Sequence, residues 1–174
     1  SSSKRILSLT GLAGVVGLLI WTFPQVARSE AAGRLAPGAA IASESHAATK
    51  DARSIVETGG NAADAAIVAA LSAGVTSPTS SGIGGGGFLV GYDAKKAEVF
   101  ALDFRERAGA SLERQVFEER PLTVKRSGAL VGVPGELRGL YALWQRMGTK
   151  SWRELVLPAV RRARDGYVVG THLA

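Results

Sequence analysis

The spacing of hydrophobic and polar positions predicts two consecutive helices near the start of the folded part of the chain. Ser45 is well placed as an N-cap for a helix that runs to Glu57 and is ended by Gly59-Gly60. Asn61 can cap the next helix, with Asp64 at position N3 completing a near-capping box. This second helix is apolar on nearly every face, which predicts that it is buried.

Two extended segments follow and predict an antiparallel hairpin. Phe88 to Tyr92 fits a buried strand, and a short polar turn separates it from a second strand, Glu98 to Arg105. Successive side chains of a strand point to opposite faces, so the second strand has two distinct faces. One face holds Phe100, Leu102 and Phe104, and the other holds Val99, Ala101, Asp103 and Arg105.

The pattern after residue 130 predicts further helices. Pro134 lies near the first turn of a helix that Gly148 ends. Ser151 and Glu154 then form a second capping box. The apolar positions of the first of these helices have the i, i+3, i+4, i+7 spacing of an amphipathic helix: Leu137, Leu140, Tyr141 and Trp144.

The remaining segments have weaker patterns. We expect Pro158 to divide the last helical segment into two short helices, the second ending at Gly166. Residues 39–43 and 167–169 fit short strands. Residues 111–127 are charged and without clear period, which predicts an irregular, exposed connection.

The N-terminal segment has the pattern of an export signal or a membrane anchor. Lys4-Arg5 precede an uncharged stretch up to Phe23, at the lower end of what spans a hydrocarbon core of about 30 Å. A cleaved signal and a retained anchor, with membrane contact through residues 4–23, both remain open. Either one places the domain outside the cytoplasm, in the periplasm or cell envelope. The expected divisions are a signal or anchor at 1–30, a linker at 31–37 and a partial domain at 38–174.

Composition excludes several classes of function. The chain has 174 residues and a formal net charge of +6, but its densest basic cluster, Arg161-Arg162-Arg164, lies late in a predicted helix, where cations favour the helix dipole. No aromatic residues interleave with this cluster, so we expect no nucleic-acid partner. The chain has no cysteine and no group with metal-ligand spacing, so we expect no disulfide, metal or cofactor.

Five glycines lie among the seven residues from Ser81 to Gly87. Gly82, Gly84 and Gly87 satisfy the dinucleotide-binding pattern G-x-G-x-x-G, but that fingerprint requires a strand before the glycines and a helix after them, and the order here is the reverse. A folded protein keeps so many glycines where side chains would block a close approach. The stretch therefore predicts a tight corner that leads into the hairpin.

Two sets of polar residues suggest chemistry. Ser43, Ser45 and His46 with nearby Asp51 include the residue types of a serine hydrolase, but no nucleophile-elbow motif surrounds either serine. Arg105 ends a half-buried strand two residues beyond an aspartate on the same face. That position fits either a structural ion pair or a contact with substrate.

Six short motifs occur in order from about Gly38 to the end. They are Ala42-Ser43-Glu44, Gly59-Gly60-Asn61-Ala62-Ala63-Asp64-Ala65, Ser81-Gly82-Ile83-Gly84-Gly85-Gly86-Gly87-Phe88, Asp103-Phe104-Arg105-Glu106, Val133-Pro134-Gly135 and Ala163-Arg164-Asp165-Gly166. Together they resemble the N-terminal part of the large subunit of the gamma-glutamyltransferases (gamma-glutamyltranspeptidases). The resemblance implies an α+β fold, an N-terminal nucleophile hydrolase-like αββα sandwich, of which this chain is an N-terminal fragment.

The resemblance also implies an activity and partners. Such a precursor cuts itself into two subunits, and the threonine exposed at the start of the small subunit attacks gamma-glutamyl amides such as glutathione. The glutamyl group then passes to water, an amino acid or a peptide. That threonine is expected beyond Ala174, so this chain supplies no catalytic nucleophile and should be inactive alone. Its expected partners are the remainder of the large subunit and the small subunit of the same precursor.

The arginine of the Asp-Phe-Arg-Glu motif is the substrate-binding residue that the resemblance implies. In the family it clamps the alpha-carboxylate of the glutamyl group, and Arg105 is the matching residue. A planar guanidinium can hold a carboxylate with two parallel hydrogen bonds. Related acylases of cephalosporin side chains or poly-gamma-glutamate, and a non-catalytic envelope-anchored binding domain, are the alternatives.

Overall fold

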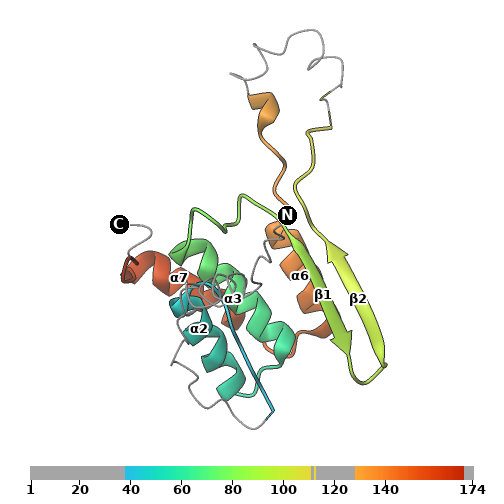
Figure 1. Ribbon diagram of the computed structural model, residues 1–174, viewed down its shortest axis with the longest axis vertical. Helices are drawn as coiled ribbons and strands as arrows, with labels where there is room; N and C mark the ends of the chain where they lie inside the picture. Colours follow the sequence, from blue (N-terminus) through green and yellow to red (C-terminus); the bar gives the residue numbers. More distant parts are fainter. Residues whose placement is uncertain (1–37, 111, 113–127, 171–174) are drawn as a thin grey trace, which may run out of the picture. The chain divides into compact units, whose positions relative to one another are not determined.

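The computed structural model describes residues 38–110, 112 and 128–170. The elements in these ranges are α2 (His46–Glu57), α3 (Ala62–Thr76), β1 (Phe88–Asp93), β2 (Glu98–Asp103), the 3-10 turn η2 (Gly128–Leu130), α6 (Glu136–Met147) and α7 (Trp152–Asp165) (Figure 1). The expected signal or anchor, the linker and most of the expected 111–127 connection lie outside the described residues. No helix in the described ranges has the length and apolar character needed to cross a membrane.

The two predicted N-terminal helices are confirmed, with their caps. The Ser45 side chain accepts a hydrogen bond from the Ala48 amide, and Asn61 and Asp64 exchange both bonds of a capping box. The predicted strand at residues 39–43 is wrong. That segment forms no hydrogen-bonded ladder and instead borders an apolar groove beside α3, because no described strand lies next to it to pair with.

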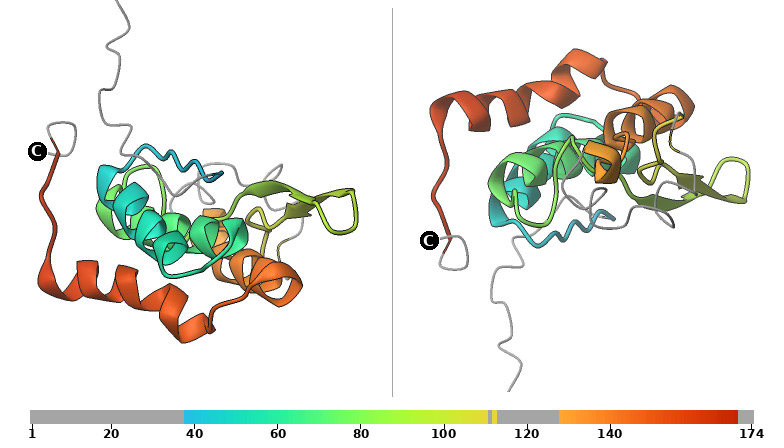
Figure 2. Two further views of the ribbon diagram at one scale, coloured as in Figure 1. Left: turned by 90° about the horizontal axis from the view of Figure 1, so that it is seen from below. Right: turned by 90° about the horizontal axis from the view of Figure 1, so that it is seen from above.

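The predicted break at Pro158 is also wrong, because α7 continues through it (Figure 2). Leu155 and Ala159 are both buried, one on each side of Pro158, and α7 packs against α3. This packing offsets the loss of one helical hydrogen bond at the proline. The predicted end at Gly166 is confirmed, with φ of 89° at that residue. Residues 167–169 form no strand, and Val168 is fully accessible.

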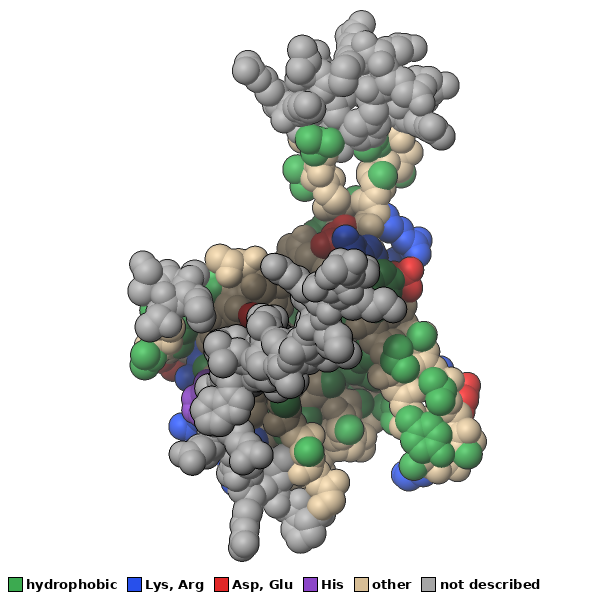
Figure 3. Space-filling view, viewed as in Figure 1, with side chains coloured by type: hydrophobic (Ala, Val, Ile, Leu, Met, Phe, Trp, Pro, Cys, Tyr) green, Lys and Arg blue, Asp and Glu red, His purple; other side chains and the backbone are tan. Residues whose placement is uncertain are grey.

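The predicted hairpin is confirmed, with Phe88 opposite Asp103 and Tyr92 opposite Val99. Its two faces also divide as expected, since Phe100 is buried and Val99 is exposed. The expectation that the first strand is buried is wrong, because only one face of the hairpin packs on α6. Apolar side chains gather on the hairpin in Figure 3, and its exposed large apolar residues are Phe88, Val90, Tyr92 and Val99.

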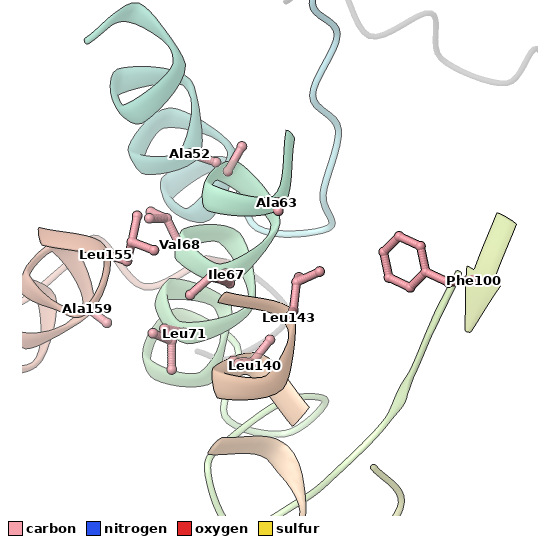
Figure 4. Close-up of a cluster of buried hydrophobic side chains, with 11 residues drawn as sticks. Ala52, Ala63, Ile67, Val68, Leu71, Phe100, Leu140, Leu143, Leu155 and Ala159 are labelled. Carbon is pink, nitrogen blue, oxygen red and sulfur yellow. The ribbon is translucent and has the colours of Figure 1, made fainter. Parts of the chain in front are cut away.

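Helix α3 lies at the centre of the core and packs against α2, α6 and α7 (Figure 4). The prediction that it is buried is confirmed by Ile67 and Val68, which have no exposed surface. On α6 the predicted face is displaced by one residue. Leu137 and Tyr141 are partly exposed, and the buried positions of α6 are Glu136, Gly139, Leu140 and Leu143.

Candidate functional site

Three of the six motifs meet at the end of β2. The Phe104 amide donates a hydrogen bond to the Gly87 carbonyl at 3.0 Å, which joins the end of β2 to the glycine-rich turn. The Gly85 carbonyl accepts from the amides of Gly135 and Glu136, at 2.9 and 3.0 Å, which joins the same turn to the start of α6. Backbone hydrogen bonds therefore connect the glycine-rich, Asp-Phe-Arg-Glu and Val-Pro-Gly motifs in one place.

Phe104 is the packing centre of this junction and is buried. A Cβ atom at Gly86 would collide with the Phe104 carbonyl oxygen, and one at Gly139 would collide with the Phe104 ring. The predicted close approach of the glycine-rich turn is therefore confirmed at Gly86, whereas Gly84 faces open space. The close approach of Gly139 to this ring also explains the displaced face of α6. The backbone that carries Arg105 is thus held from two sides.

Arg105 projects from this fixed backbone into solvent. Its side chain is 68% exposed, and its Nε atom lies 3.3 Å from Oε2 of Glu106. Asp103 contacts Arg105 through the backbone, since Oδ1 of Asp103 accepts from the Arg105 amide at 3.0 Å. The guanidinium therefore keeps most of its donors accessible, as a carboxylate clamp requires.

A pocket of about 420 Å³ lies beside Arg105, between the glycine-rich turn and the start of α6. The polar residues that line it are Ser80, Ser81, Glu106 and Glu136. Glu136 is buried, and its burial, with a smaller effect from the nearby Glu106 carboxylate, raises its pKa above the ordinary range. Within the described ranges, no three acidic or histidine side chains come together as metal ligands.

Glu106 and Glu136 were not singled out by the sequence reasoning. Two faces of α6, displaced from each other by one residue, are compatible with its helical spacing. The predicted face, which starts at Leu137, is the more hydrophobic of the two and leaves Glu136 at the edge of the solvent-exposed side. The signal that selects the correct register is Gly139, because only a glycine there admits the Phe104 ring.

Three residues of the rejected serine hydrolase hypothesis, Ser43, Ser45 and Asp51, make structural hydrogen bonds. The Ser43 hydroxyl donates to the Ser45 carbonyl at 2.8 Å, and Ser45 caps α2. Asp51 accepts from the Ser72 hydroxyl at 2.9 Å and from Nε and Nη2 of Arg162 at 3.0 and 2.6 Å. Asp51 thus ties α2 to α3 and α7, and one arginine of the basic cluster is used in that ion pair.

Comparison with known proteins places the chain in a family. The gamma-glutamyltranspeptidase family model matches residues 48–174. Glutathione hydrolase 3 of Arabidopsis thaliana is 43% identical over 121 residues, which are 69% of this chain and 19% of that protein. The chain spans about a fifth of the length of the curated relatives it matches.

Solved structures agree with this placement. The crystal structure of Helicobacter pylori gamma-glutamyltranspeptidase matches with a TM-score of 0.70 and 34% identity, over 76% of this chain and 39% of that one. Cephalosporin acylase from Bacillus halodurans matches with a TM-score of 0.67 and 30% identity, over 73% of this chain and 24% of that one. The predicted N-terminal nucleophile hydrolase-like α+β fold class is confirmed, and the chain belongs to the gamma-glutamyltranspeptidase family.

Proposed function

We propose that this chain is the N-terminal part of the large subunit of a gamma-glutamyltransferase that cleaves gamma-glutamyl amides such as glutathione. The glutamyl group passes to water, an amino acid or a peptide through a threonine nucleophile of the small subunit. The observation that carries the proposal is the exposed guanidinium of Arg105 on a backbone fixed by three family motifs.

In this proposal Arg105 orients the substrate. Two parallel hydrogen bonds to the alpha-carboxylate fix both the position and the rotation of the glutamyl group. Holding a substrate in one geometry lowers the entropic part of the barrier to attack. The packing of Gly86 and Gly139 around Phe104 supports this role, because it keeps the strand end that carries Arg105 from moving.

The wider organisation belongs to the same proposal. The precursor cleaves itself into two subunits, and the chain associates with the remainder of the large subunit and with the small subunit. Residues 1–30 direct export to the periplasm or cell envelope, which Lys4-Arg5 and the uncharged stretch after them support.

The test of this function uses the purified full-length protein and two chromogenic anilides. We expect turnover of the gamma-glutamyl anilide and much slower turnover of the glutaryl anilide, which lacks the alpha-ammonium group. Preference for the glutaryl substrate would contradict specificity for gamma-glutamyl amides and favour the acylase alternative. If the protein cleaves itself into subunits but turns over neither substrate, the proposed function is contradicted.

A further inference from the structure

The side chain of Asp103 supplies a hydrogen bond that the backbone does not supply at the end of β2. Asp103 is the last residue of that strand, and its Oδ1 atom accepts from the Arg105 amide at 3.0 Å. The Phe104 amide still donates to the Gly87 carbonyl, but no backbone carbonyl in the described ranges accepts from the Arg105 amide. The aspartate side chain thus replaces a ladder partner where the ladder stops.

Arg105 lies between two paired segments of backbone. Pairing resumes at Arg107, whose amide donates to the Val133 carbonyl at 3.3 Å and whose carbonyl accepts from the Val133 amide at 2.8 Å. The bond from Asp103 closes a small ring across this gap and restricts the dihedral angles on either side of Phe104. The direction in which the Arg105 side chain leaves the backbone depends on these angles.

The peptide group that joins Phe104 to Arg105 is held at both ends. A Cβ atom at Gly86 or at Gly135 would collide with the Phe104 carbonyl oxygen, so these glycines confine the oxygen end. Asp103 binds the other end, the Arg105 amide. Because a peptide group is planar, fixing both ends also fixes its rotation. Asp103 is exposed, so replacing its side chain removes the hydrogen bond and opens no cavity in the core.

Asp103 contacts the backbone of Arg105 and not its guanidinium. The ion pair of that guanidinium within the described ranges is with Glu106, with Nε and Oε2 3.3 Å apart. The aspartate therefore affects where the guanidinium lies without competing with a substrate carboxylate for its donors.

We propose that Asp103 is a positioning residue, which fixes the direction of Arg105 through the hydrogen bond to its amide. This inference rests on the proposed function, in which Arg105 binds the alpha-carboxylate of the substrate. The role requires an acceptor oxygen at this distance from the backbone and does not require a charge. Asparagine has such an oxygen, and alanine has none.

The test compares kcat/KM of the full-length processed protein for the gamma-glutamyl anilide and for the 4-aminobutyryl anilide, which lacks the alpha-carboxylate. Asp103→Ala should lower the value for the first substrate about three- to tenfold and leave the value for the second unchanged. Asp103→Asn should restore the wild-type value. Asp103→Glu keeps the charge but moves the acceptor by one methylene, so it should retain part of the loss and serves if the alanine variant does not cleave itself.

Asp93→Ala is the matched control. Oδ1 of Asp93 accepts from the Lys95 amide at 3.0 Å, which is the same two-residue contact at the opposite end of the hairpin. This variant should leave kcat/KM for both substrates unchanged.

Three results would overturn the proposal: no loss in Asp103→Ala, the same loss on both substrates, or a loss in Asp103→Asn as large as in Asp103→Ala. Arg105→Ala, measured alongside, separates this proposal from the proposed function. If Arg105→Ala loses only the carboxylate-bearing substrate and Asp103→Ala does not, only the role of Asp103 fails. If Arg105→Ala shows no such selectivity, Arg105 is not the carboxylate clamp, and the role of Asp103 fails with it.

Discussion

Asp64 joins two parts of the fold with a single carboxylate. It completes the cap of α3 and accepts hydrogen bonds from Thr149 and Lys150, which lie between α6 and α7. Burial disfavours its charge, but the hydrogen bonds from Thr149, Asn61 and Lys150 outweigh this effect and hold its pKa below the ordinary range. The charged form therefore stabilises the fold.

We expect Asp64→Ala to lower the free energy of unfolding of the full-length protein by at least about 2 kcal/mol at pH 7, because several donors lose their acceptor. A lowered folded-state pKa means that this stabilisation is complete above the ordinary aspartate pKa and is lost as pH falls through the folded-state value. The difference in the free energy of unfolding between wild type and Asp64→Ala should thus shrink below about pH 3.5. Urea unfolding across this range checks it, and a difference that stays constant with pH would contradict the assignment.

Glu136 should affect the pH dependence of folding stability in the opposite direction. Its raised pKa means that the folded state binds the proton more tightly than the unfolded state, so wild-type stability falls as pH rises through the window above about 4.3. Glu136→Gln has no such charge, and without ligand it should therefore be more stable than wild type at pH 7 and about equally stable near pH 4. Thermal unfolding at both pH values measures this. A variant that is less stable at pH 7 would mean that the ionised carboxylate is already compensated in the protein.

The glycine-rich turn offers a matched pair of substitutions at the scale of the element. Gly86→Ala places a Cβ against the Phe104 carbonyl and should cost about 1 to 3 kcal/mol of stability, whereas Gly84→Ala enters open space and should be nearly neutral. Gly86→Ala should also lower catalytic efficiency, because it displaces the strand end that carries Arg105. Equal melting temperatures for the two variants would show that the turn does not pack as described.

The elements that the sequence predicted correctly are those whose signals are local. Ser45, Asn61 and Ser151 satisfy backbone amides within their own first turn, so a few neighbouring residues determine each helix start. The elements missed depend on distant partners. The α6 face depends on Gly139 meeting Phe104, and the continuity of α7 depends on burial against α3.

The candidate site divides in the same way. Arg105 was proposed as a substrate-binding residue through its motif, and the alternation predicted for residues 98–105 separates it from the face of Phe100, in agreement with its exposed side chain. The pocket lined by Glu106 and Glu136 was missed because it forms only where the glycine-rich turn, Glu106 and Glu136 come together. These parts lie far apart in the sequence, so no local pattern predicts that they meet.

At the scale of the whole molecule, the exposed apolar face of the hairpin should make this chain incomplete by itself. We expect purified residues 31–174 to show no turnover of a gamma-glutamyl anilide and to aggregate at concentrations where the full-length protein stays in solution. Light scattering and the anilide assay measure the two outcomes. Turnover that survives purification and is lost on mutating a serine or histidine of this chain would contradict the nucleophile assignment.

We expect Arg105 to hold the alpha-carboxylate of the substrate, and a comparison of two variants on two substrates in the full-length processed protein tests this role. The gamma-glutamyl anilide is compared with the 4-aminobutyryl anilide, which keeps the ammonium but lacks the carboxylate. Arg105→Ala should lower kcat/KM for the first at least roughly tenfold, and Arg105→Lys should restore only part of this loss. For the second substrate, wild type and Arg105→Ala should be about equal. Loss of the same factor on both substrates, in a variant that folds and cleaves itself normally, would contradict the account.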